Sequence, residues 1–256
     1  MAHLCLELTL TGETGTGSQV ANAAAPSIPV MQGVATEVEG GRKILRFYES
    51  ERLLHWAIVI PFLVCYLTAV IMLVVYNPDP TRPYRMFFSW LHRISGVCLV
   101  VLPISTLFRG RKELRIHLHN IRHASTWLRD DFKWLLLMLP AAWNSKMKLP
   151  VQGKFNAAEK INFLVLLGSY PLYIATGALM WMKYFNVLSW FVHITLAAIA
   201  TPLILGHIYM AVINKGSRPG LPGMLSGFVD RQWAKHHYAN WYRELYEPEQ
   251  AAPAGE

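Results

Sequence analysis

Four histidines of this 256-residue chain lie within long stretches of apolar residues. An ionisable side chain is costly inside a lipid bilayer, and where one occurs it usually serves a function. Any one of these histidines could instead form a hydrogen bond to a neighbouring helix or lie at the membrane interface. Four together favour a shared chemical role, and they are His55, His92, His193 and His207.

The spacing of His193 and His207 places both rings on the same face of one helix. They are 14 positions apart, which corresponds to about 1400° of rotation, roughly 40° short of four full turns, and to a rise of about 21 Å. The two rings therefore lie near opposite leaflets. His55 begins the first apolar stretch and His92 begins the second, which runs in the opposite direction. Each leaflet thus receives two histidines: the inner pair, His55 and His207, and the outer pair, His92 and His193.

Each pair has the donor set of a haem b site. Two neutral imidazoles that face each other across a helical bundle are the axial ligands of a low-spin haem. No acidic side chain lies within the four apolar stretches, which makes another kind of transition-metal site less suitable. Gly96 follows His92 by about one turn and leaves room for a porphyrin. The pattern predicts two b haems, one held by His55 and His207 and the other by His92 and His193.

Basic residues near these histidines offer partners for haem propionates. Lys43, Arg46 and Arg52 precede the first histidine, and Arg93 follows the second. Long basic side chains also extend from apolar surfaces toward the membrane interface without binding anything. That alternative explains each of these residues at least equally well.

The elements that must position the histidines are predicted as membrane-spanning helices. The chain is 53 % hydrophobic and only 16 % charged, whereas about a quarter of the residues in a soluble domain are charged. A bilayer core requires about 20 apolar residues per helix. We expect an all-α integral membrane protein, a four-helix bundle that binds two b haems, with helices at about 53–76, 89–108, 161–182 and 188–213.

The connections between these helices differ in length. The third and fourth helices are separated by about five residues, which predicts an antiparallel hairpin. Between the second and third lies a long, mostly polar connection that contains an apolar segment at 132–143. This segment is too short to span a bilayer, so we expect a short interfacial helix in the second connection.

The chain divides into three regions. Residues 1–40 lack Lys and Arg and are rich in small residues, which predicts a flexible or partner-contacting extension. Residues 41–215 form the predicted four-helix di-haem membrane domain, and 216–256 form a cytoplasmic tail. Three cysteines exclude a disulfide scaffold, and the absence of a CxxC motif argues against zinc or an iron–sulfur cluster in this chain.

The distribution of charge predicts the orientation of the helices. Of the 24 Lys and Arg residues, 20 lie on the side that holds both ends of the bundle and the connection at 109–160. Positive residues collect on the cytoplasmic side, so we expect a multi-pass protein of the bacterial inner membrane with both termini in the cytoplasm. The net charge of +8 thus reflects topology and contact with anionic lipid rather than nucleic-acid binding.

Several motifs in about 42–247 resemble the cytochrome b (γ) subunit of respiratory formate dehydrogenases. This subunit belongs to a di-haem family that also includes the anchors of nickel–iron hydrogenases and thiosulfate reductases. The GKFN segment and the WAKHH tail favour the formate branch. The similar segments are RLLHW at 52–56, WLHRISG at 90–96, GKFNAAEK at 153–160, GHIYMA at 206–211 and GFVDRQWAKHH at 227–237.

The resemblance implies a quinone site beside the inner haem. Asn156 would form a hydrogen bond to an oxygen of menaquinone or ubiquinone, and His207 would lie next to it. The family motif usually continues Ala-Gly-Gln-Lys, whereas this chain has Ala158 and Glu159, a change that alters the charge or the proton path of the pocket. The residues alone also allow a simpler interpretation, in which Asn156 caps a helix and Glu159 completes a capping box.

The resemblance also implies the partners and the overall function. They are an iron–sulfur (β) subunit and, through it, a molybdenum or tungsten catalytic (α) subunit, since nothing in this chain resembles a formate-oxidising site. The chain would anchor the complex and pass electrons from the iron–sulfur subunit across the membrane through two b haems to quinone. Two alternatives remain: the anchor of a hydrogenase or a sulfur-compound reductase, and a non-redox scaffold whose histidines only brace helices.

Overall fold

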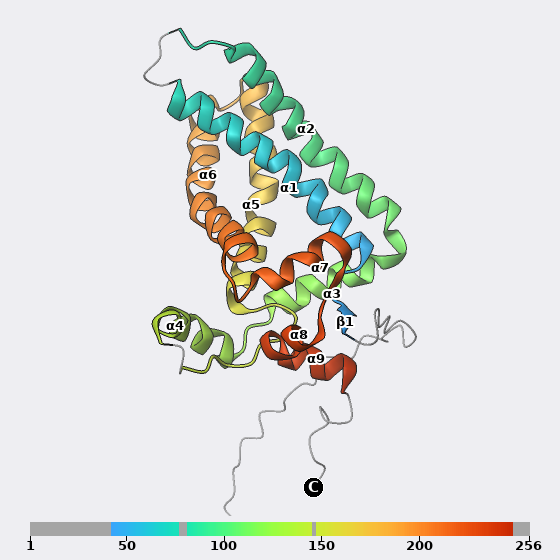
Figure 1. Ribbon diagram of the computed structural model, residues 1–256. Helices are drawn as coiled ribbons and strands as arrows, with labels where there is room; N and C mark the ends of the chain where they lie inside the picture. The colour runs from blue at the N-terminus through green and yellow to red at the C-terminus, as the bar shows by residue number, and fades with distance from the viewer. Residues whose placement is uncertain (1–41, 77–80, 145–146, 248–256) are drawn as a thin grey trace, which may run out of the picture. The chain divides into compact units, whose positions relative to one another are not determined.

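The computed structural model describes residues 42–76, 81–144 and 147–247. The predicted extension at 1–40 and the end of the predicted tail lie outside these residues. The described part is almost entirely helical (Figure 1), and three of its four long helices carry the four histidines of interest.

The four long helices confirm the predicted fold class, because each is long and apolar enough to cross a membrane. Helices α1 and α6 each continue into a short π-helix, η1 (Ile71–Val75) and η3 (Tyr209–Ile213). No more than 17 % of the most apolar window of any of them is buried, so most apolar side chains face outward, as expected for contact with lipid. The long helices are α1 (Glu49–Val70), α2 (Arg85–Arg109), α5 (Ala157–Trp181) and α6 (Asn186–Ile208).

The four helices begin slightly earlier than predicted, and in α1 and α5 the reason is a polar first turn. In α1 a carboxylate oxygen of Glu51 accepts a hydrogen bond from the backbone N–H of Tyr48 at 2.8 Å. In α5 Glu159 accepts one from the backbone N–H of Asn156, also at 2.8 Å. Such bonds satisfy the free donors of a helix start, but a hydropathy pattern does not register charged residues. The connection between α5 and α6 spans only 182–185, as the predicted hairpin requires.

A small folded unit made of residues 42–48 and 215–246, which we call the cap, lies at one end of the bundle (Figure 1). Its strands β1 (Lys43–Leu45) and β2 (Phe228–Asp230) pair in antiparallel fashion. The rest consists of short helices: η4 (Arg218–Gly220), α7 (Leu221–Ser226), α8 (Arg231–His237) and α9 (Ala239–Tyr246). The predicted tail is therefore largely folded. Its buried core comprises Ile44, Val229, Ala234, Tyr238, Trp241 and Tyr242.

Two hydrogen bonds hold the cap against the start of α1. Arg52 donates from Nη1 to the carbonyl oxygen of Leu225 at 2.8 Å, and Trp56 donates from Nε1 to that of Met224 at 3.1 Å. Because these two residues flank His55 along α1, the bonds fix the part of the helix that carries the first member of the inner pair.

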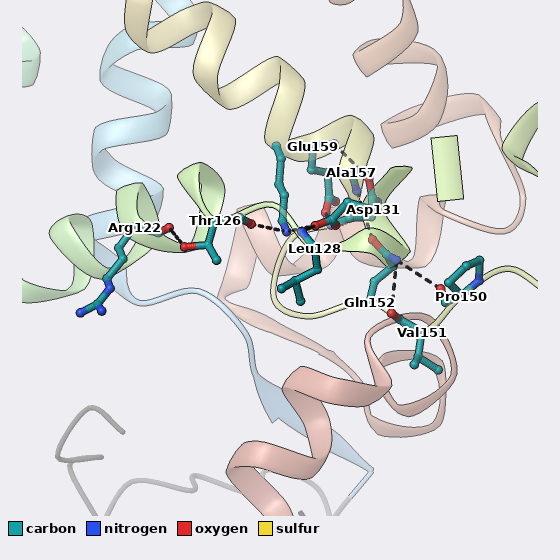
Figure 2. Close-up of polar contacts among 11 residues, drawn as sticks. Arg122, Thr126, Leu128, Asp131, Pro150, Val151, Gln152, Ala157 and Glu159 are labelled. Atoms are coloured by element: carbon teal, nitrogen blue, oxygen red, sulfur yellow. Dashed lines mark hydrogen bonds and ion pairs between the residues drawn. The ribbon is translucent and has the colours of Figure 1, made fainter. Parts of the chain in front are cut away.

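The second connection contains more helix than predicted. After a short turn, η2 (Arg111–Glu113), it forms α3 (Leu114–Ser125) and α4 (Arg129–Trp143). Helix α4 confirms the predicted helix at 132–143, although it starts three residues earlier, because Asp131 accepts the backbone N–H of Leu128 at 2.8 Å (Figure 2). Its apolar Phe132 and Leu136 are 57 % and 77 % exposed, which suits an interfacial helix. Helix α3 was not predicted.

Candidate functional sites at two histidine pairs

The fold brings the members of both predicted pairs together. The ring centres of His92 and His193 are 6.3 Å apart, and their planes are inclined by 62°. Those of His55 and His207 are 6.5 Å apart, with planes inclined by 49°. Each pair joins α6 to a different helix, α2 for the outer pair and α1 for the inner pair.

These distances fit a single metal ion between the two rings of each pair. A histidine nitrogen lies about 2 Å from a bound transition metal and the ring centre lies roughly 1.1 Å farther away, so two rings on opposite sides of one ion have centres about 6.3 Å apart. Direct stacking of the two rings would place their centres closer together. A hydrogen bond between the rings would not require similar separations in the two pairs. The described residues include no cluster of three or more His, Cys, Asp or Glu side chains suited to a metal.

Two threonines orient the rings of the outer pair. Oγ1 of Thr68, on α1, lies 2.9 Å from Nδ1 of His92, and Oγ1 of Thr176, on α5, lies 2.8 Å from Nδ1 of His193. The carbonyl oxygen of Cys65 lies 3.0 Å from the same Nδ1 of His92. Both threonine side chains are buried. The Nδ1 atoms are thus engaged, and each Nε2 is left as a possible metal ligand.

The outer pair borders an apolar cavity of about 250 Å³. Glycines occupy the wall where a porphyrin would need space: nothing lies within 4 Å of the position of a Cβ on Gly96, and a Cβ on Gly177 would lie 3.7 Å from Cε1 of His193. Arg93 also lines the cavity, and its guanidinium carbon lies 5.4 Å from the ring centre of Trp90 and 5.8 Å from that of Trp181. The cavity therefore combines an apolar space with a cation, as a haem with its propionates requires.

The inner pair is held differently. His55 Nδ1 is buried and has no hydrogen-bond partner among the described residues. Its ring packs edge-on against Trp56, with centres 5.1 Å apart. His207, by contrast, is exposed on the surface of the chain, and nothing lies within 4 Å of the position of a Cβ on the preceding Gly206. The inner pair is therefore accessible to a further molecule from the side of α6.

Asn156 caps α5, as the simpler interpretation of the sequence expected. Its Oδ1 accepts a hydrogen bond from the backbone N–H of Glu159 at 2.9 Å, and Glu159 returns the bond to Asn156, which completes a capping box. The hydroxyl of Tyr238 in the cap donates to Oε1 of Glu159 at 2.8 Å. An amide group has two N–H donors, so the role of Asn156 as the N-cap of α5 does not exclude a contact with quinone. That contact remains a prediction.

The surroundings of Glu159 join the cap to the start of α5. Nη2 of Arg46 lies 4.0 Å from Oε1 of Glu159. Burial raises the pKa of Tyr238, and the negative charge of Glu159 raises it further. The charge of Arg46 and a side-chain hydrogen bond with Asn156 act in the opposite direction. Tyr238 is thus held as a neutral hydrogen-bond donor.

A buried ionic cluster at the same end of the bundle as the inner pair was not predicted from the sequence. Nζ of Lys154 lies 2.6 Å from Oε1 of Glu51 and 2.9 Å from Oδ1 of Asn120, and Asn120 donates to the same Glu51 oxygen at 2.5 Å. Burial lowers the pKa of Lys154, and the carboxylate of Glu51 partly offsets this. These three residues are far apart in the sequence, so no local sequence motif predicts the cluster.

A second buried ion pair joins α4 to α5. Nζ of Lys160 lies 2.8 Å from Oδ2 of Asp131 and donates to the carbonyl oxygen of Thr126 at 2.9 Å. Gln152 donates to the carbonyls of the preceding two residues and accepts the backbone N–H of Ala157 at 3.2 Å (Figure 2). These bonds fix the entry of α5, and with it the position of Asn156.

Four apolar helices with facing histidine pairs define a membrane-bound b-type cytochrome, and the comparison with known proteins agrees. The family model described as prokaryotic cytochrome b561 matches residues 46–227. The chain belongs to this family. It is therefore a multi-pass membrane protein that binds haem b.

Curated relatives narrow the similarity further. The chain is 28 % identical over 218 residues to the cytochrome b556(Fdn) subunit of the nitrate-inducible formate dehydrogenase of Escherichia coli K12, covering 81 % of this chain and 94 % of that protein. It is 27 % identical over 223 residues to the formate dehydrogenase cytochrome b556 subunit of Haemophilus influenzae, covering 81 % of this chain and 86 % of the relative.

Proposed function

We propose that this protein is the di-haem cytochrome b anchor of a formate dehydrogenase complex and passes electrons from an iron–sulfur subunit to quinone. The observation that carries the proposal is the presence of two facing histidine pairs, with ring centres 6.3 Å and 6.5 Å apart, in a bundle of four apolar helices. The similarity to two formate dehydrogenase cytochrome subunits supports the identity of the complex.

The histidines would act as the four iron ligands. When bound, two b haems supply one-electron transfer at two levels of the membrane. The chain contributes the neutral imidazoles, the glycines that leave space beside them and an apolar surround that excludes water. Arg93 would meet a propionate of the outer haem, because it lines the cavity beside the outer pair. The inner site would lie between α1 and α6, beneath the cap.

Quinone, as menaquinone or ubiquinone, would bind at the inner end of the bundle. Asn156 would donate an amide N–H to a quinone oxygen, next to the exposed His207. Quinone reduction consumes two protons, and Glu159 is a carboxylate that connects to the cap through Tyr238 at 2.8 Å. Glu159 would have to take up a proton from the cap side before it could pass one to the quinone. The family pattern has an uncharged Gln where this chain has Glu159.

The catalytic chemistry would reside on other subunits. An iron–sulfur (β) subunit would deliver electrons near the outer pair, and a molybdenum or tungsten (α) subunit would oxidise formate. The distribution of Lys and Arg, 20 of 24 on one side, supports a cytoplasmic location of the cap and the second connection, because positive residues collect on that side of the membrane. A cysteine introduced at exposed Leu149 should then react with an impermeant reagent only after the inner membrane is permeabilised. Labelling in intact spheroplasts would reverse the orientation.

One purification tests the core of the proposal. The protein is isolated from its membrane under mild conditions, and its reduced-minus-oxidised visible spectrum and co-purifying subunits are recorded. We expect b-type bands with two components, partner subunits that oxidise formate, and haem reoxidation on addition of a menaquinone or ubiquinone analogue. Absence of b-type bands would indicate a non-redox scaffold. Two b haems together with a hydrogenase or sulfur-compound reductase as partner would retain the anchor and overturn the formate assignment.

A further inference from the structure

The two threonines beside the outer pair act as acceptors of hydrogen bonds from the histidines. The hydroxyl hydrogen of Thr176 is directed to its own helix, where the carbonyl oxygen of Leu172 lies 2.6 Å from Oγ1. That of Thr68 is directed likewise to the carbonyl oxygen of Val64, at 2.7 Å. Each hydroxyl therefore offers a lone pair to the ring that faces it. Nδ1 of each histidine must then carry the proton.

The second contact of His92 leads to the same tautomer. The carbonyl oxygen of Cys65 can only accept a hydrogen bond, and it lies 3.0 Å from Nδ1 of His92. A proton on Nδ1 leaves Nε2 with its lone pair free for iron. The two threonines come from helices other than those of the histidines they contact, so they fix ring orientation relative to the whole bundle.

The inner pair has no equivalent of these contacts. Nδ1 of His55 is buried without a partner among the described residues. No hydroxyl group of the described chain is placed against His207 in the way that Thr176 is placed against His193. The two proposed sites therefore have the same type of iron ligand. They differ in the hydrogen bonds that polarise the imidazole rings.

We propose that Thr68 and Thr176 are positioning residues that lower the reduction potential of the outer haem relative to what the same ligands would give without them. The inference rests on the proposed function, because it takes His92 and His193 as ligands of one iron. A hydrogen bond donated from Nδ1–H makes the opposite nitrogen a stronger electron donor. A stronger donor stabilises the ferric charge more than the ferrous one, and the potential falls.

This effect has a direction that suits the proposed electron path. Lowering the potential of the outer haem favours electron transfer from the outer to the inner site. The contribution should be larger at Thr176 than at Thr68. His92 retains the Cys65 carbonyl at 3.0 Å when the Thr68 hydroxyl is removed, whereas Thr176 is the acceptor that faces His193.

The test uses potentiometric titration of the purified, haem-loaded complex, with Thr68→Val and Thr176→Val as the principal variants. Valine keeps the shape of threonine and removes the hydroxyl. Thr201→Val is the matched control, because Thr201 also lies within a membrane-spanning helix, α6, but its hydroxyl contacts the hydroxyl of Tyr66 at 2.8 Å rather than a histidine. Thr68→Ser and Thr176→Ser restore the hydroxyl. Visible spectra and low-temperature electron paramagnetic resonance follow each haem separately.

We expect both Val variants to raise the midpoint potential of one and the same haem, Thr176→Val more than Thr68→Val. The Ser variants and Thr201→Val should leave both potentials in place. Loss of the outer haem from the Val variants with its retention in the Ser variants also supports the role of the hydroxyls. Unchanged potentials in fully loaded Val variants, or haem loss from the Ser variants as well, would overturn it.

A parallel variant separates this inference from the proposed function. His193→Ala should remove the haem whose potential Thr176→Val shifts. If His193→Ala and His92→Ala abolish no common haem, the proposed ligand pairs are wrong. If they do abolish a common haem while the potentials in the Val variants are unchanged, the ligands stand and only the role of the threonines is overturned.

Discussion

The outer and inner histidine pairs have nearly the same ring separation but quite different surroundings. The outer rings are each hydrogen-bonded through Nδ1 and border an apolar cavity. At the inner pair, Nδ1 of His55 has no such partner within the part of the chain that the structure describes, and His207 is exposed. The geometry that places two ligands on one iron is therefore separable from the contacts that tune it, and the two sites can differ in potential and access without any change of ligand.

The two ends of the bundle also differ in the contacts that stabilise them. Beside the outer pair the helices are joined by two short connections, one between η1 and α2 and one at 182–185 between α5 and α6. Beside the inner pair lie α3, α4 and the cap, which bury two ion pairs, Glu51 with Lys154 and Asp131 with Lys160. A buried charge that loses its partner is strongly destabilising. The inner end thus depends on polar contacts, whereas the outer end depends on apolar packing and two hydroxyls.

The largest expected effect comes from removing single ligands. Each His→Ala variant should lose one of the two haems, because one imidazole cannot hold a low-spin bis-histidine iron. His55→Ala and His207→Ala should abolish the same spectral component, and His92→Ala and His193→Ala the other. Haem content and the reduced-minus-oxidised spectrum of the purified variants measure this directly.

Exposed His236 in the cap provides the control for ligand removal. His236→Ala should retain both haems, since it faces neither pair. A different grouping of the four ligand variants, for example His55→Ala with His92→Ala, would show that the pairs are wrong. The comparison between the outer and the inner site would then have no basis.

The two histidine pairs could be predicted because the membrane level of each histidine depends on the length, direction and periodicity of its own helix. Apolar stretches of sufficient length define the four helices, and the interval between His193 and His207 fixes their common face. The structure places the rings as that reasoning requires. The family motif likewise marks the start of α5 at Asn156, whose capping box is recognisable from Glu159 three residues later.

The contacts around the histidines could not be predicted in this way. Thr68 and His92 lie on different helices, and so do Thr176 and His193. Their proximity depends on how the helices are rotated against one another, which no periodicity within one helix determines. The pairing of β1 with β2 and the bond of Lys154 to Glu51 join segments more than 100 residues apart. Such contacts are properties of the packed chain.

The next largest effect should come from the buried ionic cluster of the inner end. Glu51→Gln leaves the ammonium group of Lys154 buried without its counter-charge, which should cost about 3–5 kcal/mol. Because Glu51 lies one turn before His55 on α1, the inner haem should be lost at a lower temperature than the outer one. Thermal loss of the two spectral components in detergent measures the difference.

An exposed ion pair offers the matched control for Glu51. Asp130 and Lys133 are 3.5 Å apart on α4, with side chains 54 % and 65 % exposed, and such pairs contribute little. Asp130→Asn should not change the temperature at which either haem is lost. The double variant Glu51→Gln with Lys154→Met should be more stable than Glu51→Gln alone, because it removes the stranded charge. Equal loss of both haems in Glu51→Gln would argue against a separate role of the inner end.

Asn156 allows capping and quinone binding to be separated at the inner site. Asn156→Ser retains an oxygen that can accept the backbone N–H of Glu159, but it removes the amide donors. We expect normal haem content and quinone-analogue binding weakened by about 1–2 kcal/mol, roughly 5- to 30-fold. Asn156→Leu should in addition lower the folding stability by about 1 kcal/mol, because it removes the N-cap hydrogen bond of α5. Quinone-dependent haem reoxidation and thermal unfolding distinguish the two effects.

A serine variant with unchanged quinone kinetics would assign Asn156 to capping alone. Neither substitution should affect the outer haem, since α5 contributes Thr176 to that site about five and a half turns farther along. A changed potential of the outer haem in Asn156→Ser would mean that the two ends are coupled, and the comparison would need revision.

The smallest expected effect concerns acid sensitivity, which should be confined to the inner end. Among the described residues, the histidines outside the two pairs all belong to α3 and the cap. The rings of His119 and His123 are 4.2 Å apart on α3. Burial, followed by the positive charges of His123 and Lys154, lowers the pKa of His119 from 6.5 to about 4.

The direction of the effect follows from this lowered pKa. Between pH 6.5 and about 4 the unfolded chain binds a proton at His119 that the folded chain does not, so stability falls as the pH falls through this range. Because the ring is partly exposed, the loss should stay below about 1 kcal/mol. We expect the thermal midpoint of the inner haem to decrease on acidification while that of the outer haem changes less. His119→Gln should reduce the decrease, and His236→Gln should not. An equal acid response of both haems in all three proteins would show that the acid-sensitive group lies elsewhere.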